Sequence, residues 1–231
     1  MKIMGLIGGM SWESSAEYYR ITNRLVREKL GGHHSAESLM YSFDFAPVER
    51  LQREGDWKEA TRRMINAAIY LQKGGADFVV ICTNTMHRTA DEVEAAIGIP
   101  LLHIADATAR AVKKTGVQKV GLLGTRFTME EDFYRGRLED EHRLRVIVPE
   151  LEERRIVDRV IYDELVMGEI NPDSRDDYLE IIRELRNHGA EGVILGCTEI
   201  GLLIKEGDVE LPVFDTTRIH ARAAVEMALA E

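Results

Sequence analysis

The sequence contains few cysteines and none in a paired arrangement, which limits the chemistry that its thiols can perform. Cys82 and Cys197 are the two cysteines of the 231-residue chain, and neither has a neighbour at metal-ligand spacing or a Cys-x-x-Cys partner. In a reducing compartment, two isolated thiols are either buried apolar side chains or reactive groups. Composition alone leaves both interpretations open.

Long apolar runs are also absent. No segment approaches the roughly 20 apolar residues that a membrane-spanning helix needs. The opening segment MKIMGLIGGMSWESS reaches glycine and polar residues within about ten positions, too early for the apolar part of a secretory signal. We therefore expect a cytoplasmic protein that has no membrane partner.

Positive charge is in deficit, because 30 Lys and Arg residues face 40 Asp and Glu residues and leave a formal net charge of -10. Nucleic acids and anionic membranes are bound by basic surfaces, so neither is expected as a partner. An acidic small substrate is not excluded. The chain also lacks G-x-G-x-x-G and G-K-[ST], so no nucleotide site is indicated.

The sequence does contain a regular alternation of short apolar runs and longer helical stretches. Hydrophobic residues make up 45% and charged residues 30%, as in globular proteins, and the alternation predicts a parallel α/β fold. The clearest helix is expected over 56–73, where apolar residues recur at helical spacing behind Asp56 as the N-cap. Strands are expected near Lys2–Gly8, Leu39–Asp44, Phe78–Cys82, Leu101–His103, Lys119–Leu123, Arg143–Val148, Gly192–Gly196 and Val213–Phe214.

Three segments of the first half recur in the same order in the second half. MGLIG at 4–8 corresponds to VGLLG at 120–124, GADFVVI at 75–81 to GAEGVIL at 189–195, and IPLL at 99–102 to LPVF at 211–214. Any one match could reflect shared α/β chemistry, but three in register indicate a duplication. We predict two pseudo-symmetric lobes, each a mainly parallel sheet flanked by helices, formed by 1–98 plus 212–231 and by 99–211.

The loops after the repeated strands are the first place to look for a site, because ligands of open parallel sheets bind beyond the carboxyl ends of the strands. The repeat places Thr83 opposite Cys197 and Asn84 opposite Thr198. Two lobes related by a pseudo-twofold axis would present these loops to one cleft between them. Such a site suits a reaction that handles protons on two faces of one substrate.

A thiol is well suited to that reaction. Inverting a carbon stereocentre without a cofactor requires removing a proton from one face and returning one to the other. The pKa of a free thiol, about 8.5, lies near physiological pH, and a helix N-terminus can lower it. Cys197 is predicted at the junction of a strand and a helical turn, where free N–H groups would stabilise both a thiolate and a substrate carboxylate.

The chain resembles the aspartate/glutamate racemase family, which includes amino-acid racemases that work without pyridoxal phosphate. The resemblance rests on GLIGGMSWES at 5–14, CTNTMH at 82–87, LLGTRFTMEEDFYRGRL at 122–138, GCTEIGLL at 196–203 and LPVFDT at 211–216. It implies a duplicated α/β fold, no cofactor, a homodimer, and two cysteines that act as opposed acid/base groups. The second of these cysteines corresponds to Cys197.

The first cysteine position departs from the family pattern. Family members usually read Cys-Asn-Thr, whereas Thr83 precedes Asn84 and Thr85 here, and Cys82 lies one residue earlier. A shift of one residue along a strand turns a side chain to the opposite face, so Cys82 is expected to point away from the cleft. A threonine hydroxyl can donate or relay a proton. We therefore predict a one-thiol enzyme that resembles the L-selective branch of the family, with Cys197 and Thr83 as its catalytic pair.

Substrate contacts are expected from the loops that the repeat and the resemblance single out. The predicted binding residues are Met10, Gln52, Asn84, Thr85, Thr125, Thr128 and Thr198, and for Thr125 and Thr128 the competing interpretation is ordinary helix capping. Many family members carry a lysine in the region that reads ELVMG at 164–168 here. Arg50, Arg53 and Arg126 are candidates to bind an acidic side chain in its place, although each is more commonly a solvated surface charge.

Other polar residues have simpler interpretations. His33, His34 and His87 lack further ligands at helical spacing, so no metal site is predicted. Glu199 could orient Cys197 or act as a helix-start carboxylate, and the sequence favours the second role.

Three functions compete on this evidence. The leading one is racemisation of an amino acid, glutamate or aspartate first, by proton transfer at the α-carbon. A single catalytic cysteine also fits a decarboxylase of a small malonate or a related isomerase of a small carboxylic acid. A protein that binds an amino acid without exchanging its proton would keep the same lobes and loops.

Overall fold

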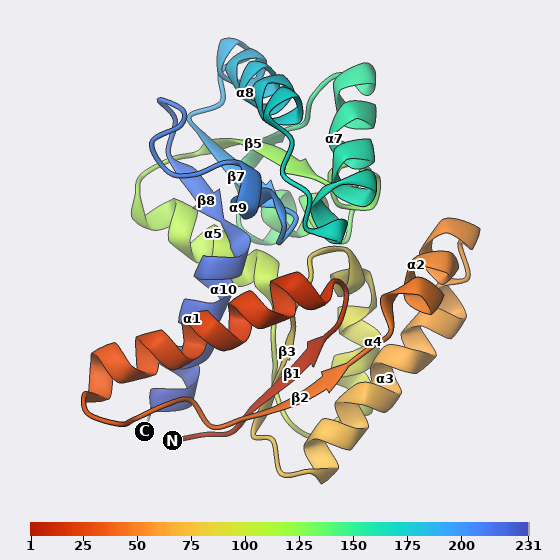
Figure 1. Cartoon of the computed structure of the whole chain (residues 1–231), viewed down its shortest axis with the longest axis vertical. Coiled ribbons are helices and arrows are strands. Elements are labelled where there is room, and N and C mark those ends of the chain that lie inside the picture. Colours follow the sequence, from red (N-terminus) through yellow and green to blue (C-terminus); the bar gives the residue numbers. More distant parts are fainter. Residues whose placement is uncertain (231) are drawn as a thin grey trace. The chain divides into compact units, whose positions relative to one another are not determined.

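The computed structural model describes residues 1–230, which divide into two compact units (Figure 1). The first unit contains Met1–His103 and the C-terminal residues from His220, and the second contains Ile104–Ile219. Each unit is built on a parallel four-stranded sheet. The α/β fold class and the two-lobed organisation predicted from the sequence are therefore confirmed.

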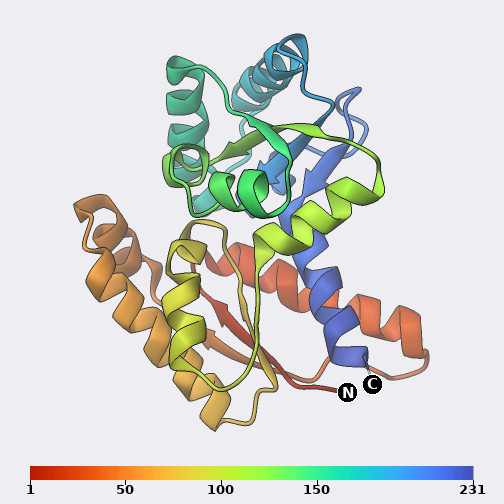
Figure 2. The same ribbon diagram turned by 180° about the vertical axis from the view of Figure 1, so that it is seen from behind.

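The first sheet has the strand order β2-β1-β3-β4 and is covered on both faces. Its strands are β1 (Met4–Gly8), β2 (Ser38–Ser42), β3 (Phe78–Ile81) and β4 (Leu101–Leu102). One face packs against α1 (Trp12–Leu30) and α10 (Thr216–Leu229), which the two opposite views show side by side (Figures 1 and 2). The other face packs against α2 (Phe45–Glu54), α3 (Trp57–Lys73) and α4 (Ala90–Ala96).

The second sheet repeats this arrangement with the order β6-β5-β7-β8. Its strands are β5 (Lys119–Gly124), β6 (Arg145–Ile147), β7 (Gly192–Gly196) and β8 (Val213–Asp215). One face packs against α7 (Leu151–Asp163), α8 (Pro172–Asn187) and the short η3 (Leu165–Met167). The other face packs against α5 (Ile104–Lys114) and the π-helical η2 (Arg137–Glu141). Short helices follow three strands: η1 (Thr85–Thr89), α6 (Arg126–Glu130) and α9 (Ile200–Leu203).

All eight predicted strands are present, each with ends within two residues of those expected. The identical strand orders support the duplication inferred from the repeat. The turns agree as well, because Gly75 and Gly189 occupy matching positions between a helix and a central strand, with φ of 98° and 91°. That left-handed conformation strains residues that carry a side chain, so the repeated glycine serves the same turn twice.

The boundaries between the units differ from those predicted. The predicted boundaries at 98/99 and 211/212 would assign β4 to the second lobe and β8 to the first. Instead, β4 pairs with β3 in the first sheet and β8 pairs with β7 in the second. The chain changes unit only after each of these strands, so that α5 packs on the second sheet and most of α10 on the first. Strand pairing therefore moves both boundaries toward the C-terminus.

The helix predicted behind Asp56 is confirmed. The Asp56 carboxylate accepts a hydrogen bond from the Glu59 N–H at 3.1 Å and so caps α3. The buried residues of α3 are the small and apolar ones that recur at helical spacing: Ala60, Met64, Ala67, Ala68 and Leu71.

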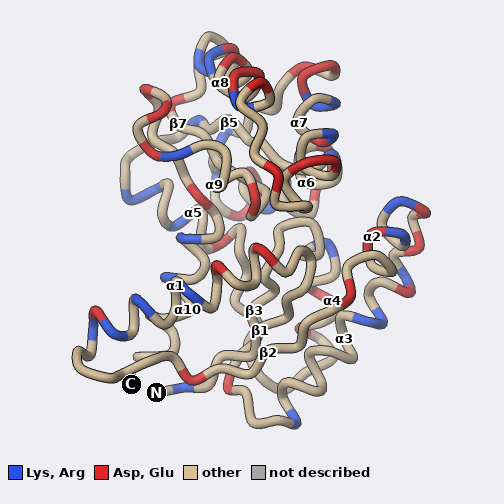
Figure 3. The backbone as a smooth tube through the Cα atoms, in the orientation of Figure 1, with Lys and Arg blue, Asp and Glu red and all other residues tan. Residues whose placement is uncertain are grey.

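Charged residues lie mainly on the helices, whereas β1, β3 and β7 contain none (Figure 3). Many of them form pairs of opposite sign three or four residues apart, such as Glu59 with Arg62 and Arg63 on α3. In residues 1–230, no helix is both long and apolar enough to cross a membrane.

Candidate active site

Cys197 directly follows β7, at the carboxyl end of a central strand of the second sheet. Its side chain is 8% exposed, and it borders an apolar cluster that includes Leu123, Ile200 and Leu203. The thiol donates a hydrogen bond to Oε2 of Glu199 at 3.0 Å. Cys197 therefore has a narrow exposed surface and a fixed hydrogen-bond partner.

Glu199 is the centre of a small buried network. Its carboxylate is 2% exposed, and the same Oε2 that accepts from Cys197 also accepts from the Thr198 hydroxyl at 2.8 Å. The Thr217 hydroxyl donates to the Thr198 carbonyl at 3.3 Å. The predicted capping role of Glu199 is wrong, because its side chain makes no capping hydrogen bond to α9. The carboxylate orients the thiol instead.

The surroundings of Cys197 favour the protonated thiol. Burial is the largest cause that raises the pKa of Cys197 well above its ordinary value, and the negative charge of Glu199 and its hydrogen bond add to the effect. The backbone N–H of Glu199 lowers this pKa but does not reverse the direction. The predicted lowering by a helix N-terminus is therefore not found, because α9 has four residues and its dipole is correspondingly small.

Thr83, Asn84 and Thr85 occupy the equivalent position after β3 in the first sheet. They are 8%, 1% and 5% exposed. The Nδ1–H of His87 donates to the Thr83 carbonyl at 2.7 Å, which ties the loop to η1. The sequence offered no signal for this contact beyond the four-residue spacing of Thr83 and His87.

Cys82 lies in the core of the first unit. It is fully buried in the cluster that contains Phe78 and Val80 and the inner face of α10, and burial raises the pKa of its thiol. Val79 and Ile81 belong to the cluster on the opposite face of the sheet. The alternation of faces that the sequence predicts for Cys82 and its neighbours is thus observed.

Met10 and Gln52 are buried near the ends of β1 and α2. Each is 4% exposed, and the Gln52 amide contacts the Met86 sulfur at 3.1 Å. The Gly9 N–H, just after β1, donates to the Ser15 hydroxyl at 2.8 Å. That donor is therefore engaged within the protein.

Thr125 and Thr128 follow β5 and lie in contact with each other. Thr125 is the N-cap of α6, its hydroxyl accepts from the Thr128 N–H at 3.4 Å, and the two hydroxyls are 3.2 Å apart. Thr125 is 4% exposed and Thr128 has no exposed surface. The capping interpretation is confirmed, and Thr128 lies behind Thr125.

Asp158 belongs to this environment, although the sequence analysis did not select it. It is half-buried on α7, and its carboxylate accepts from the Arg126 N–H at 2.6 Å. Burial raises the pKa of Asp158, and its negative charge contributes to the raised pKa of Cys197. Nothing in its local sequence distinguishes it from the other acidic residues of an amphipathic helix.

The three arginines considered for an acidic substrate side chain have different surroundings. Arg53 is exposed and its guanidinium lies 3.7 Å from the Glu49 carboxylate. The Arg126 guanidinium lies 5.2 Å from the centre of the Phe127 ring. Arg50 is exposed and forms no ion pair with the described residues. Arg50 is therefore the one of the three whose charge is not already compensated by a carboxylate or an aromatic ring.

One group of potential metal ligands occurs among residues 1–230, formed by Asp106, Glu141 and His142. Arg137 already pairs with Asp106 through two hydrogen bonds, at 2.7 and 2.9 Å, and lies 3.4 Å from Glu141. His142 contacts the same Asp106 carboxylate at 2.8 Å. This group is an ion-pair network in which the guanidinium supplies the positive charge.

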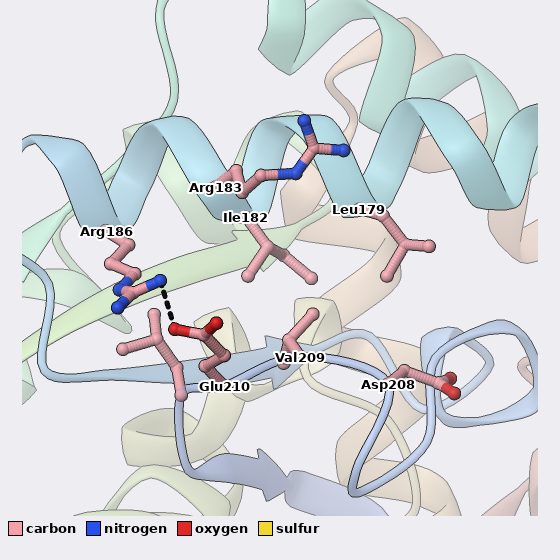
Figure 4. A pocket seen from close by; sticks show the side chains of 8 residues that line it. Leu179, Ile182, Arg183, Arg186, Asp208, Val209 and Glu210 are labelled. Carbon is pink, nitrogen blue, oxygen red and sulfur yellow. Dashed lines mark ion pairs between the residues drawn. The ribbon is translucent and has the colours of Figure 1, made fainter.

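A groove on the surface of the second unit lies apart from the predicted site residues. It runs between α8 and 208–211, with Leu179, Ile182 and Val209 among its lining residues (Figure 4). Arg186 on α8 pairs with Glu210 across it. Because none of the predicted catalytic or binding residues lines this groove, it is not the candidate active site.

Apart from Gln52 on α2, the predicted site residues thus follow the carboxyl ends of β1, β3, β5 and β7, the two central strands of each sheet. A model of the Asp/Glu/hydantoin racemase family matches residues 7–224. The chain belongs to this family.

Individual relatives agree with the assignment. The broad-specificity amino-acid racemase RacX of Bacillus subtilis is 24% identical over 183 residues, which cover 76% of this chain and 75% of that protein. A Yersinia pestis protein provisionally assigned as an Asp/Glu racemase is 55% identical, with a TM-score of 0.93 and full coverage of both chains. An aspartate racemase homologue from Pyrococcus horikoshii is 38% identical, with a TM-score of 0.86 and full coverage of both chains.

The Cys197–Glu199 contact predicts how the thiol reacts with an alkylating reagent. Because the thiolate is the reactive form and the pKa is raised, alkylation of Cys197 should accelerate as pH rises through 9 without levelling off below it. Glu199→Gln removes a charge that contributes to the raised pKa, so alkylation at pH 8 should become faster, roughly threefold for each unit by which the pKa falls, because the larger thiolate fraction is partly offset by the lower nucleophilicity of a less basic thiolate.

Peptide mapping by mass spectrometry measures the rate at each cysteine. Asp158→Asn is the matched control and should accelerate the reaction less, since Asp158 is a smaller cause of the raised pKa. Cys82 should remain unmodified in the folded protein because it is fully buried. Slower alkylation of Cys197 in Glu199→Gln would contradict the electrostatic role of Glu199.

Proposed function

We propose that this protein racemises an amino acid without a cofactor, with Cys197 and Thr83 exchanging protons with opposite faces of the α-carbon. The observation that carries the proposal is the equivalence of the two residues: each directly follows, or lies one residue beyond, the same central strand of two sheets with identical strand order. Family membership over residues 7–224 supports the reaction class.

Cys197 supplies the stronger of the two groups. In the free protein its raised pKa keeps it as a thiol, which is the form that can return a proton to a carbanion. To remove a proton it must first lose its own, and the Glu199 carboxylate, 3.0 Å from the sulfur, is the nearest acceptor. The positive ammonium group of a bound amino acid would stabilise the thiolate that results.

We propose that Thr83 exchanges a proton with the opposite face of the substrate α-carbon. Its hydroxyl is a weak base at neutral pH, so we propose that it donates or relays a proton, directly or through a water molecule. The two directions then use chemically different groups, which predicts unequal turnover of the two enantiomers. This agrees with the resemblance to the L-selective branch of the family.

We propose glutamate or aspartate as the first substrates to test, with other amino acids as a broader set. The expected contacts come from loops at the ends of β1, β3, β5 and β7 and from α2. They are Met10, Gln52, Asn84, Thr85, Thr125 and Thr198, with Thr128 supporting Thr125 from behind. Hydroxyl and amide groups of this kind suit an α-carboxylate and an α-ammonium group.

The discriminating experiment follows the α-proton of each enantiomer by NMR in deuterated water, with no added cofactor. Exchange with inversion supports a racemase, loss of carbon dioxide from a malonate supports the single-cysteine decarboxylase, and binding without exchange supports an amino-acid-binding protein. We expect inversion of glutamate or aspartate.

The two cysteines should respond oppositely to substitution. Cys197→Ala should lower inversion by about 10²–10⁴-fold, the usual contribution of a general acid or base. Cys82→Ala should retain inversion in the protein that remains folded, because Cys82 is a core residue. The measurement is the NMR rate with folding checked by circular dichroism, and equal loss of activity from both variants would contradict the assignment of Thr83 rather than Cys82.

Thr83→Cys should make the two directions more alike. A second thiol gives the first half the same chemical group as the second, so the ratio of the two turnover numbers should move toward one. Thr85→Cys is the matched control, because it adds a thiol to the same loop two residues away. A Thr83→Cys variant whose ratio stays at the wild-type value would remove Thr83 from the reaction.

We further propose that the protein is a cytoplasmic homodimer. The family resemblance supports the dimer, as do Trp12 and Tyr19, which are 68% and 56% exposed and lie two helical turns apart on one face of α1.

The two free thiols fit a reducing compartment such as the cytoplasm, and cell fractionation would test this location.

Substitution on α1 should break such a dimer. Tyr19→Glu places a charge in the proposed interface and should weaken association by about 100-fold or more, since an uncompensated buried charge costs about 3–5 kcal/mol. Sedimentation equilibrium measures the change. Tyr70→Glu, on the equally exposed Tyr70 of α3, should leave the dimer intact. A wild-type protein that sediments as a monomer at micromolar concentration would refute the proposal.

A further inference from the structure

Three imidazole rings are buried together in the first unit, next to the Thr83 loop. His87 is 2% exposed, His103 is 7% exposed and His220 has no exposed surface. The His87 ring packs edge to face on both others, with centroids 4.6 Å from His103 and 5.7 Å from His220. The three residues come from η1, the end of β4 and α10, so the cluster joins segments that are distant in sequence.

Hydrogen bonds fix the orientation of two of these rings. The Leu102 carbonyl can only accept, so the His220 Nε2 at 2.8 Å must carry a hydrogen. In the neutral ring Nδ1 is then an acceptor, and the Tyr18 hydroxyl donates to it at 2.8 Å. By the same reasoning, His87 Nδ1 carries the hydrogen that is donated to the Thr83 carbonyl at 2.7 Å. His87 is thus held against a ring whose own orientation is locked.

We infer that His87 is a positioning residue for Thr83: it holds the backbone of the catalytic loop so that the Thr83 hydroxyl is aimed at the substrate. This inference rests on the proposed function, in which Thr83 exchanges a proton with the substrate. Thr83 lies beyond the end of β3, so its carbonyl has left the strand ladder. The His87 N–H supplies the bond that the strand no longer provides.

The accuracy of this placement matters for the rate. Proton transfer requires the donor and acceptor atoms to lie within about 3.2 Å, and a misplacement of about 1 Å can lower a rate roughly 10²-fold. A hydroxyl on a short side chain cannot compensate for a shifted backbone by extending. The ring cluster around His87 therefore acts on the reaction through the position of Thr83, without touching the substrate.

The test is a double-mutant cycle between His87 and Thr83, read as the rate of deuterium exchange at the α-carbon. His87→Leu removes the N–H donor and should slow inversion by about 10–100-fold in the wild-type background. In the Thr83→Ala background the same substitution should change the residual exchange by less than about threefold, because the group that it positions is already gone. Equal losses in both backgrounds would show a general structural role and overturn the inference.

Two further variants separate hydrogen bonding from folding. The amide nitrogen of His87→Asn can occupy the place of Nδ1 and should retain most of the inversion rate, whereas that of His87→Gln extends toward the place of Nε2 and should behave like His87→Leu. Both are polar and similar in size, so the comparison holds even if His87→Leu does not fold. Equal activity of the Asn and Gln variants would overturn the inference.

Thr89→Val is the matched control in the same short helix. Thr89 is 1% exposed, and its hydroxyl bonds to the Met86 carbonyl at 2.8 Å without reaching Thr83. It should leave inversion within about threefold of wild type, and a loss as large as that of His87→Leu would show that η1 tolerates no change. The proposed function fails separately, if the wild-type protein does not invert glutamate, aspartate or any other amino acid.

Discussion

The hydrogen bond from the Cys197 thiol to the Glu199 carboxylate is the contact on which the chemistry of the candidate site depends. A buried sulfur beside a buried carboxylate cannot easily become an anion, because two negative charges would then share one poorly solvated space. The resting protein therefore stores a proton at this position. A positive charge brought close to the sulfur would oppose this preference, and the α-ammonium group of an amino acid, the substrate class that we propose, carries such a charge.

The first half of the molecule carries different groups at the equivalent position. Its loop has the Thr83 hydroxyl where the second half has the Cys197 thiol. The fixed hydrogen bond of this loop runs from the His87 N–H to the Thr83 backbone carbonyl, whereas that of the second half runs from the Cys197 thiol to the Glu199 carboxylate. A threonine hydroxyl has little tendency to ionise. Neighbouring groups can therefore influence its reaction more readily through the position of the hydroxyl than through its acidity. The proposed mechanism accordingly relates Cys197 to its electrostatic environment and Thr83 to the ring cluster, which bonds to the Thr83 carbonyl through His87. Duplication supplied two equivalent scaffolds, and the side chains on them have since diverged.

Much of the fold could be predicted from the sequence, because it is encoded locally. The apolar strands and the Asp56 cap are each specified by a few adjacent residues, and both were found where expected. The unit boundaries were misplaced because they depend on which strand β4 and β8 pair with, and pairing is a long-range property. The internal repeat indicated two lobes but did not show with which strands β4 and β8 pair.

The site was predicted less completely, for the same reason. Position in the repeat sufficed to select Thr83 and Cys197 as candidates, but the contact of Glu199 depends on where its side chain turns, and it turns back toward the sulfur instead of toward α9. Asp158 and His220 approach their neighbours from helices far along the chain, and no local pattern marks them. The proposed catalytic residues follow strand ends and could be selected from the sequence, whereas their neighbours are brought in by tertiary packing.

The unlike groups of the two halves also constrain how a substrate preference can arise. Enantiomers have equal free energies in water, so the ratio of kcat/KM for the two directions must equal one whatever the acid/base groups are. A slow step that depends on Thr83 must then be accompanied by a proportionally lower KM for the same enantiomer. Under the proposed mechanism, any difference in kcat between the two enantiomers is therefore matched by a proportional difference in KM, and both the unlike acid/base groups and the binding loops contribute to it.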